Sequence, residues 1–343
     1  MQIVLHAGMH KTGTTSFQKW LADSRPVLET QGVAVFPTDP RILVQLPDDY
    51  DPDAIRFELA KAEKQGVGLA VFSHESLSEC FAEDLDALKR MLAPHPIRYV
   101  ITMRHWAGFL PSRWKQNCKR RDAQSFPAFA EGVFAAPDDR LEARFDLAVR
   151  RAAQAGLRDI RVVSYDFEMA RNRLLPSLAE ACLLPVAAMI APDQVTWVNG
   201  SAGVEDVDRV RLFNGVLSRA CGRLLNPIAQ RSTTGLAPDM FYDLPPRHQA
   251  ILRRRPDIAK RLDTLIDARR VRFAPQAEAI RDLTDSVTRT AAPFLVPEQE
   301  GHLFPGVEPC PVDVSTLEID DVPPDLQQDI AAELRAEWPD LFG

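Results

Sequence analysis

The strongest constraint on this fold is a regular alternation, in the first half of the chain, between short β-branched runs and amphipathic segments. The β-branched runs predict strands at 2–6, 33–36, 67–73, 97–103 and 160–165. The amphipathic segments predict helices at 14–23, 77–92, 107–120, 141–155 and 173–183. In the first of these helices, Phe17, Trp20 and Leu21 form one apolar face, which we expect to pack on the sheet. Strands and helices that alternate in this way predict an α/β fold with a parallel sheet flanked by helices.

The second half of the chain has a different pattern. Beyond about residue 195 the strand signal fades, and the sequence predicts helices at 204–224, 246–271 and 276–290. From residue 298 the chain is acidic, and its first part contains several prolines. We therefore expect an α/β core over 1–200, a helical extension over 201–297, and an acidic arm over 298–343 that is irregular until a terminal helix at 324–338.

Composition narrows the function classes. The formal net charge of −7 argues against a general nucleic-acid binder. The 5 cysteines are scattered and include no CxxC pair, which argues against a disulfide framework or a zinc site. No apolar run approaches the roughly 20 residues that span a bilayer, and the N-terminus does not resemble a signal peptide. We expect a soluble, cytoplasmic protein without a transmembrane segment.

The segment that carries most chemistry is GMHKTGTTS, which follows the first predicted strand and opens the first predicted helix. The N–H groups of a first helical turn lack partners within the helix, and the helix dipole favours an anion there. Gly13 permits close approach of the backbone, and Lys11 adds a positive charge. Hydroxyl donors come from Thr12, Thr14, Thr15 and Ser16. A capped turn needs only one such hydroxyl, so the segment predicts a phosphate-binding loop rather than a capped turn with a solvated lysine.

The order of the loop residues distinguishes between phosphate loops. The nucleoside-triphosphate loop has the form GxxxxGK[ST], whereas here Lys11 precedes Gly13 by two residues. The run KTGTTS after an opening strand resembles the 5′-phosphosulfate loop of sulfotransferases that use 3′-phosphoadenosine 5′-phosphosulfate (PAPS). The resemblance implies that Lys11 contacts the bridging oxygen between the phosphate and the sulfuryl group. It also implies a P-loop-like, three-layer α/β domain.

A second segment, YVITMRHWAGFLPS, strengthens the resemblance. Arg104 closes a predicted strand, and Ser112 follows eight residues later on a predicted helix. In the family, an arginine and a serine with this spacing hold the 3′-phosphate of the donor. Arginine suits that role because it is always charged and forms bidentate bonds with phosphate.

A third segment, VVSYDF, resembles the family strand whose tyrosine approaches the adenine, which would be Tyr165 here. The alternative for Tyr165 is an aromatic side chain that packs in the core. One family feature is absent, because Ser16 stands where many relatives have a tryptophan that stacks on the adenine. The sequence thus leaves open what holds the adenine ring.

The candidates for a catalytic base are His74 and Glu75, in the segment GVGLAVFSHESLSE. They lie where a predicted strand gives way to a helix, at the edge where ligands bind in open α/β sheets. The family keeps its base at this strand end, a histidine in some branches and a glutamate in others. Adjacent side chains of an extended backbone point to opposite sides, so we expect only one of the two to reach an acceptor. The alternatives are a helix cap and a buried structural histidine.

These features together predict a PAPS-dependent sulfotransferase. The enzyme would move the sulfuryl group to a hydroxyl or amine acceptor, a carbohydrate or lipid-linked glycan by family analogy, and release 3′-phosphoadenosine 5′-phosphate (PAP) without a metal. Two alternatives come from other classes. A nucleotide kinase or NTPase would require GK[ST] and an acidic Mg²⁺ ligand, and a non-catalytic nucleotide-binding scaffold would require only the loop.

Overall fold

The structure is a computed structural model that describes residues 1–36, 52–120, 122–135, 137, 142–189, 191, 204–221, 244–306 and 311–339. The chain forms two compact units. The first comprises Met1–Trp106, Pro137–Gly200 and Glu278–Glu308, and the second comprises Ala107–Ala136, Ser201–Ala277 and Pro309–Gly343. Each unit combines parts of the expected core, helical extension and acidic arm. The domain boundaries expected from the sequence therefore remain a prediction.

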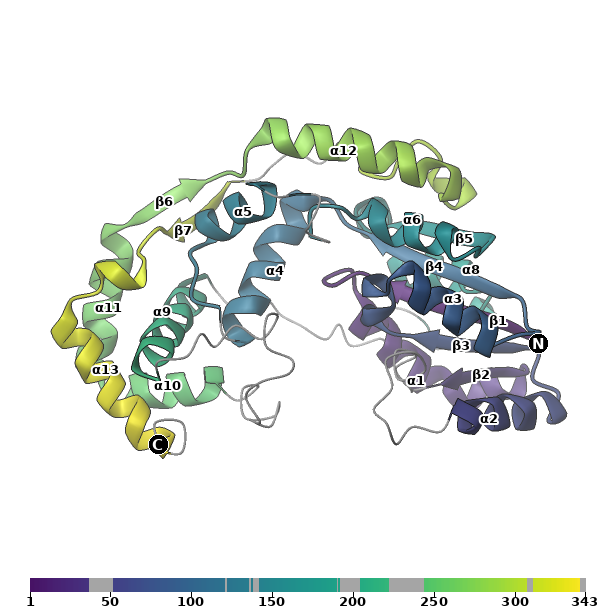
Figure 1. Cartoon of the computed structure of the whole chain (residues 1–343), viewed down its shortest axis with the longest axis horizontal. Coiled ribbons are helices and arrows are strands. Elements are labelled where there is room, and N and C mark those ends of the chain that lie inside the picture. Colours follow the sequence, from purple (N-terminus) through teal and green to yellow (C-terminus); the bar gives the residue numbers. More distant parts are fainter. Residues whose placement is uncertain are drawn as a thin grey trace. The chain divides into compact units, whose positions relative to one another are not determined.

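The first unit contains a five-stranded parallel sheet in the order β2-β3-β1-β4-β5 (Figure 1). Its strands are β1 (Gln2–Gly8), β2 (Val33–Phe36), β3 (Leu69–Ser73), β4 (Ile97–Met103) and β5 (Asp159–Ser164). The predicted strands differ from these by at most two residues at any end. The expected α/β fold with a parallel sheet is therefore confirmed.

Helices flank this sheet. Those of the first unit are α1 (Thr14–Thr30), α2 (Pro52–Lys64), α3 (Ala82–Met91), α6 (Asp146–Gln154), α7 (Tyr165–Ala170), α8 (Leu174–Ala181) and α12 (Ala277–Ala291), whose first residue lies in the second unit. Short 3₁₀ helices are η2 (Glu75–Glu79), η4 (Val186–Ala188), η7 (Ala292–Phe294) and η8 (Pro297–Gln299). Helices α1 and α8 contact each other over one part of the sheet, while α3 and α6 form a second pair beside β4 and β5. The sequence missed α2 and α7, and α1 runs past its predicted end because the helix continues through Pro26.

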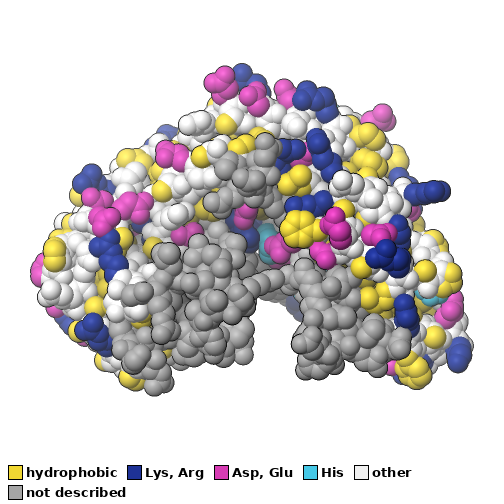
Figure 2. All heavy atoms as spheres, in the orientation of Figure 1, with side chains coloured by type: hydrophobic (Ala, Val, Ile, Leu, Met, Phe, Trp, Pro, Cys, Tyr) yellow, Lys and Arg dark blue, Asp and Glu magenta, His cyan; other side chains and the backbone are white. Residues whose placement is uncertain are grey.

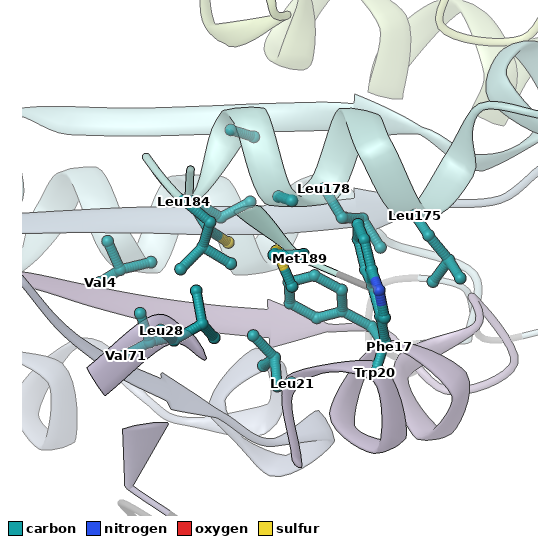
Figure 3. Close-up of a cluster of buried hydrophobic side chains, with 14 of the residues drawn as sticks. Val4, Phe17, Trp20, Leu21, Leu28, Val71, Leu175, Leu178, Leu184 and Met189 are labelled. Atoms are coloured by element: carbon teal, nitrogen blue, oxygen red, sulfur yellow. The ribbon is translucent and has the colours of Figure 1, made fainter. Parts of the chain in front are cut away.

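A cluster of buried apolar side chains joins α1 and α8 to the sheet (Figure 3). Phe17, Trp20 and Leu21 of α1 lie in this cluster, which confirms the predicted apolar face of the first helix. Val4 of β1 and Leu178 of α8 pack in the same cluster. This packing fixes the N-terminus of α1 beside the end of β1.

The second unit is mainly helical, as the sequence predicts for residues beyond 200, but the sequence missed its helix over 126–135. Its helices are α4 (Trp106–Arg120), whose first residue lies in the other unit, α5 (Phe126–Ala135), α9 (Val204–Ala220), α10 (Leu244–Arg254), α11 (Pro256–Ala268), α13 (Pro324–Glu337) and the 3₁₀ helix η9 (Ile319–Asp321). The predicted terminal helix is confirmed by α13, whose Leu326, Ile330 and Leu334 are buried.

Two predictions for the second half are wrong. The helix expected over 246–271 is two helices, α10 and α11, because the helix is interrupted before Pro256. The last residues of the expected range belong to strand β6 (Arg270–Phe273). The arm expected to be irregular contains strand β7 (Val312–Ser315), which pairs with β6 in antiparallel register. Each strand has only four residues, so neither gives a strong alternating pattern in the sequence.

Three further observations bear on the compositional predictions. Within the described ranges, no helix is both long and apolar enough to cross a membrane. Cys80, Cys118, Cys182 and Cys221 are free thiols, and Cys310 lies outside the described residues. On the face drawn in Figure 2, basic and acidic side chains are interspersed among apolar ones.

Candidate functional site

The predicted site residues of the first unit lie at one edge of the parallel sheet. All five strands are parallel, so the carboxyl ends of β1, β3, β4 and β5 share this edge. From β1 the chain proceeds to β2 and β3 on one side, and from β4 it proceeds to β5 on the other. In open α/β sheets, ligands bind outside the carboxyl ends at the position where the strand order reverses in this way. Here that position lies between the loops that follow β1 and β4.

The loop after β1 has a tightly constrained backbone. A Cβ atom on Gly8 would lie 2.1 Å from Thr14 Oγ1, and one on Gly13 would lie 2.9 Å from Leu174 Cδ2. Gly13 has φ 81, and Lys11 adopts the left-handed region at φ 63, which is uncommon for a residue with a side chain. The two glycines therefore allow the chain to turn sharply between β1 and α1.

The N-terminus of α1 is arranged as an anion site would be. Its N-cap is Gly13, which makes no side-chain cap hydrogen bond, and its first turn contains no acidic residue. No threonine therefore caps α1, which contradicts the alternative of an ordinary turn with a threonine cap. Thr12 instead donates its hydroxyl to the carbonyl of Met9. Such an N-terminus presents backbone N–H groups and the positive end of the helix dipole.

The hydroxyl residues of the loop differ in exposure. Thr12, Thr14 and Ser16 are buried, and Thr15 is exposed. The hydroxyl oxygen of Thr14 is buried and finds no hydrogen-bond partner within the described part of the chain. Lys11 is half-buried. An unpartnered buried hydroxyl beside a helix N-terminus is consistent with a loop shaped for a ligand.

Arg104 follows β4 directly and contacts the loop after β1. Its Nη1 donates a hydrogen bond to the backbone carbonyl of Lys11 at 3.0 Å. Its guanidinium carbon lies 4.7 Å from the centroid of the Tyr165 ring. Its buried Nε has no hydrogen-bond partner among the described residues. Three residues that the sequence selected independently thus lie together at the edge of the sheet.

The remaining member of the predicted phosphate sites is Ser112. It is half-buried on α4, so the predicted helical position is confirmed. It belongs to the second unit, whereas Arg104 belongs to the first.

His74 and Glu75 have different environments. His74 is the N-cap of η2, and its Nδ1 accepts a hydrogen bond from the backbone N–H of Ser76 at 3.3 Å. Glu75 instead reaches the loop after β1, where its Oε2 lies 2.6 Å from Nδ1 of His10. His74 therefore caps η2, whereas Glu75, for which the sequence offered the cap as an alternative, contacts the loop after β1.

His10 carries a contact that the sequence did not predict. Its Nε2 lies 2.7 Å from Oε1 of Glu79, at the far end of η2. The side chains of His10, Glu75 and Glu79 are 17%, 26% and 35% exposed, so the group is accessible from solvent. The sequence selected Glu75 as a candidate base and placed His10 beside Lys11, but it gave no signal for Glu79, which lies 69 residues from His10 along the chain.

Below the loop, His6 of β1 is buried in the sheet. Its Nδ1 lies 2.8 Å from the hydroxyl of Ser73 on β3, and its Nε2 lies 3.4 Å from that of Thr102 on β4. Burial lowers the pKa of His6 to about 3, although the charge of Glu75 acts in the opposite direction. His6 is therefore a neutral link between three strands near the site.

A second link joins the ends of β4 and β5. The backbone N–H of His105 donates a hydrogen bond to Oδ2 of Asp166 at 2.6 Å. Burial raises the pKa of Asp166, and the hydrogen bond from His105 and the charge of Arg104 partly offset that effect. Because Arg104 and Tyr165 are the chain neighbours of this pair, the link fixes the backbone from which both side chains project.

The chain has no match among protein-family models, and no curated protein or solved structure matches it significantly. Its function is therefore inferred from the chemistry of the site itself.

Proposed function

We propose that the first unit binds PAPS and that the protein is a cytoplasmic PAPS-dependent sulfotransferase. The observation that carries the proposal is the contact between Arg104 and the carbonyl of Lys11. It joins two segments that each resemble a phosphate-binding element of this enzyme family, at the edge where open α/β sheets bind ligands. The strand order and the loop after β1 also support assignment to the P-loop-like class.

The residues of this edge fit the chemistry of sulfuryl transfer. The acceptor oxygen or nitrogen forms a bond to sulfur, and the bond between sulfur and the 5′-phosphate oxygen breaks. The phosphate keeps the electron pair, so negative charge develops near the N-terminus of α1 and Lys11. Backbone N–H groups and an ammonium group that are already oriented stabilise such charge. The proton of the acceptor passes to a base at the end of β3, for which Glu75 and His74 are the candidates.

The remaining roles follow the family resemblance. Arg104 holds the 3′-phosphate of the donor and Tyr165 approaches the adenine, while the role expected for Ser112, a residue of the second unit, stays a prediction. The products are a sulfated acceptor, PAP and a proton. The acceptor class is a carbohydrate or lipid-linked glycan with a hydroxyl or amine group.

Calorimetry on the whole protein in EDTA tests the proposal. We expect PAP to bind more tightly than adenosine 5′-phosphate, because it engages two phosphate sites, and more tightly than ATP. A separate titration uses ATP with Mg²⁺. Tighter binding of ATP in its magnesium complex would favour a nucleotide kinase or NTPase. PAP binding without turnover of PAPS on any acceptor would favour a non-catalytic scaffold.

A further inference from the structure

The side chain of His10 lies between two carboxylates. Nδ1 is 2.6 Å from Oε2 of Glu75, and Nε2 is 2.7 Å from Oε1 of Glu79. Both distances are typical of charge-assisted hydrogen bonds. The two carboxylates begin and end the same 3₁₀ helix, η2, while His10 comes from the loop that precedes Lys11.

This geometry selects one protonation state. An ionised carboxylate only accepts hydrogen bonds, and a neutral imidazole has one donating and one accepting nitrogen. A neutral His10 would place its accepting nitrogen against an accepting oxygen. An imidazolium donates from both nitrogens and satisfies both carboxylates. Glu79 therefore stabilises the charged form of His10, which in turn donates to Glu75.

We propose that His10 and Glu79 are positioning residues that hold the carboxylate of Glu75 as the base for sulfuryl transfer. The inference rests on the proposed function and decides between its two candidate bases. His74 engages its Nδ1 with Ser76 inside its own turn, whereas Glu75 is directed to the loop that contains Lys11. A base must lie close to the donor's reacting group, and Glu75 is the candidate that contacts this loop.

The proton balance is simple. The acceptor O–H or N–H proton passes to Glu75 as the bond from the acceptor to sulfur forms and the bond from sulfur to the 5′-phosphate oxygen breaks. Glu75 then releases the proton to solvent. The imidazolium of His10 keeps Glu75 ionised before this step and fixes its orientation. Among the described residues, other charged groups near this edge are Lys11, Arg104 and Asp166, and Arg151 donates a hydrogen bond to the backbone carbonyl of Glu79, while buried His6 is neutral.

The test compares Glu79→Ala and Glu79→Gln with Glu83→Ala, a control that removes an exposed carboxylate from the first turn of α3. Three measurements are made on the full chain. They are PAP affinity by calorimetry, PAP release from PAPS with water or glucosamine as acceptor, and the protonation of His10 by ¹⁵N NMR of labelled histidine.

We expect Glu79→Ala to slow PAP release by about 10–100-fold, because misplacement of a reacting group by about 1 Å has an effect of that size. PAP affinity should stay at the wild-type value, since neither positioning residue is assigned to the nucleotide. Glu79→Gln, whose amide oxygen still accepts from His10, should recover part of the rate. At pH 7.5, NMR should show both ring nitrogens of His10 protonated in the wild type and in Glu83→Ala, but not in Glu79→Ala.

The double variant Glu75→Gln, Glu79→Ala provides a further check. Glu75→Gln alone should slow release by about 10²–10⁴-fold. Adding Glu79→Ala should cause no further loss, because the two residues act through one carboxylate. Independent losses that multiply would overturn the inference.

The failure of the inference and that of the proposed function give different results. If PAP binds and is released but Glu79→Ala has the wild-type rate, or if His10 is neutral in the wild type, the positioning role is overturned and the function stands. If PAP does not bind, or PAPS releases no PAP with either acceptor, the proposed function is overturned and the role with it.

Discussion

The guanidinium of Arg104 donates a hydrogen bond to the backbone carbonyl of Lys11 at 3.0 Å, although 93 positions separate the two residues. The bond ties the end of β4 to the turn after β1. Lys11 has φ 63, so its backbone needs support from outside the turn. Arg104 supplies that support through Nη1, while its Nε has no hydrogen-bond partner in the described part of the chain. One side chain can therefore shape the loop and bind an anion.

The first prediction concerns Arg104→Ala. The variant should lose PAP affinity by about 2–5 kcal/mol if the 3′-phosphate is desolvated, because removing one partner of a charged hydrogen bond has an effect of that size. The affinity for adenosine 5′-phosphosulfate, which lacks the 3′-phosphate, should fall less. This smaller decrease measures only what Arg104 contributes by supporting the loop. Calorimetry in EDTA gives both values. Equal losses for the two ligands would show that Arg104 supports the loop and does not bind the 3′-phosphate.

The second prediction concerns Lys11→Met, which keeps most of the side-chain length and removes the charge. Turnover of PAPS should fall by about 10²–10³-fold, as for loss of one donor to a developing oxyanion, while PAP affinity falls much less. The difference arises because negative charge on the bridging oxygen develops during S–O cleavage. Lys19→Met is the matched control, since Lys19 is an exposed lysine of α1 that pairs with Asp23. A loss of affinity as large as the loss of turnover would contradict the assigned role.

The sequence predicted the sheet well for a physical reason. The inner strands are largely buried, so they are short apolar runs such as LAVFS and IRYVITM that stand out between polar segments. Helix α2 was missed although its buried Ile55, Leu59 and Ala62 follow helical spacing. Strands β6 and β7 could not be predicted from their own sequences, because a four-residue strand is too short to show a clear pattern and is stabilised by pairing with its partner strand.

The candidate site was predictable in part. Parallel strands bring their carboxyl ends to one edge, so the proximity of the Lys11 and Arg104 segments follows from topology. The contacts of His10 do not, since its partners come from a different loop and depend on the exact direction of three side chains. The hydrophobic pattern of the sequence also did not indicate that Ser112 and Arg104 belong to two different compact units.

The third prediction concerns Gly8→Ala. A Cβ atom at this position would lie 2.1 Å from Oγ1 and 3.1 Å from Cβ of Thr14, so the start of α1 has to shift. We expect a loss of about 1–3 kcal/mol in the free energy of unfolding, which is typical of overpacking. Gly68→Ala is the matched control, because no heavy atom lies within 4 Å of its added Cβ. Adding Thr14→Gly to Gly8→Ala should recover part of the stability in urea unfolding, because the added Cβ still lies 3.1 Å from Cε1 of His6. No recovery at all would place the strain elsewhere.

The last prediction concerns His248, a buried histidine of the second unit. Its ring packs against Phe213 and Trp338, and neither ring nitrogen has a hydrogen-bond partner among the residues that the structure describes. Burial lowers its pKa from 6.5 to about 3. Between these two values the unfolded chain binds a proton at this site and the native protein does not. The contribution of His248 to stability is therefore greatest above pH 6.5 and falls as the pH drops toward 3.

The variant His248→Phe should remove this contribution while keeping the ring packing, whereas His6 and His105, whose pKa values burial lowers to about 3 and about 4, are common to the variant and the wild type. At pH 7.5 the variant should be at least as stable as the wild type, because the substitution removes a buried polar ring that lacks hydrogen-bond partners and therefore destabilises the native state. At pH 5 its advantage should grow by about 2 kcal/mol, the linkage expected for a group with an unfolded pKa of 6.5 that stays neutral when folded. Urea unfolding at the two pH values measures the change. His302→Phe, which replaces an exposed histidine by the same residue, is the matched control. Buried carboxylates such as Asp208, whose pKa is raised by burial, act in the opposite direction but are common to all three proteins. An advantage of His248→Phe that is the same at pH 7.5 and pH 5 would show that His248 is already protonated in the native protein or does not titrate in this range on unfolding.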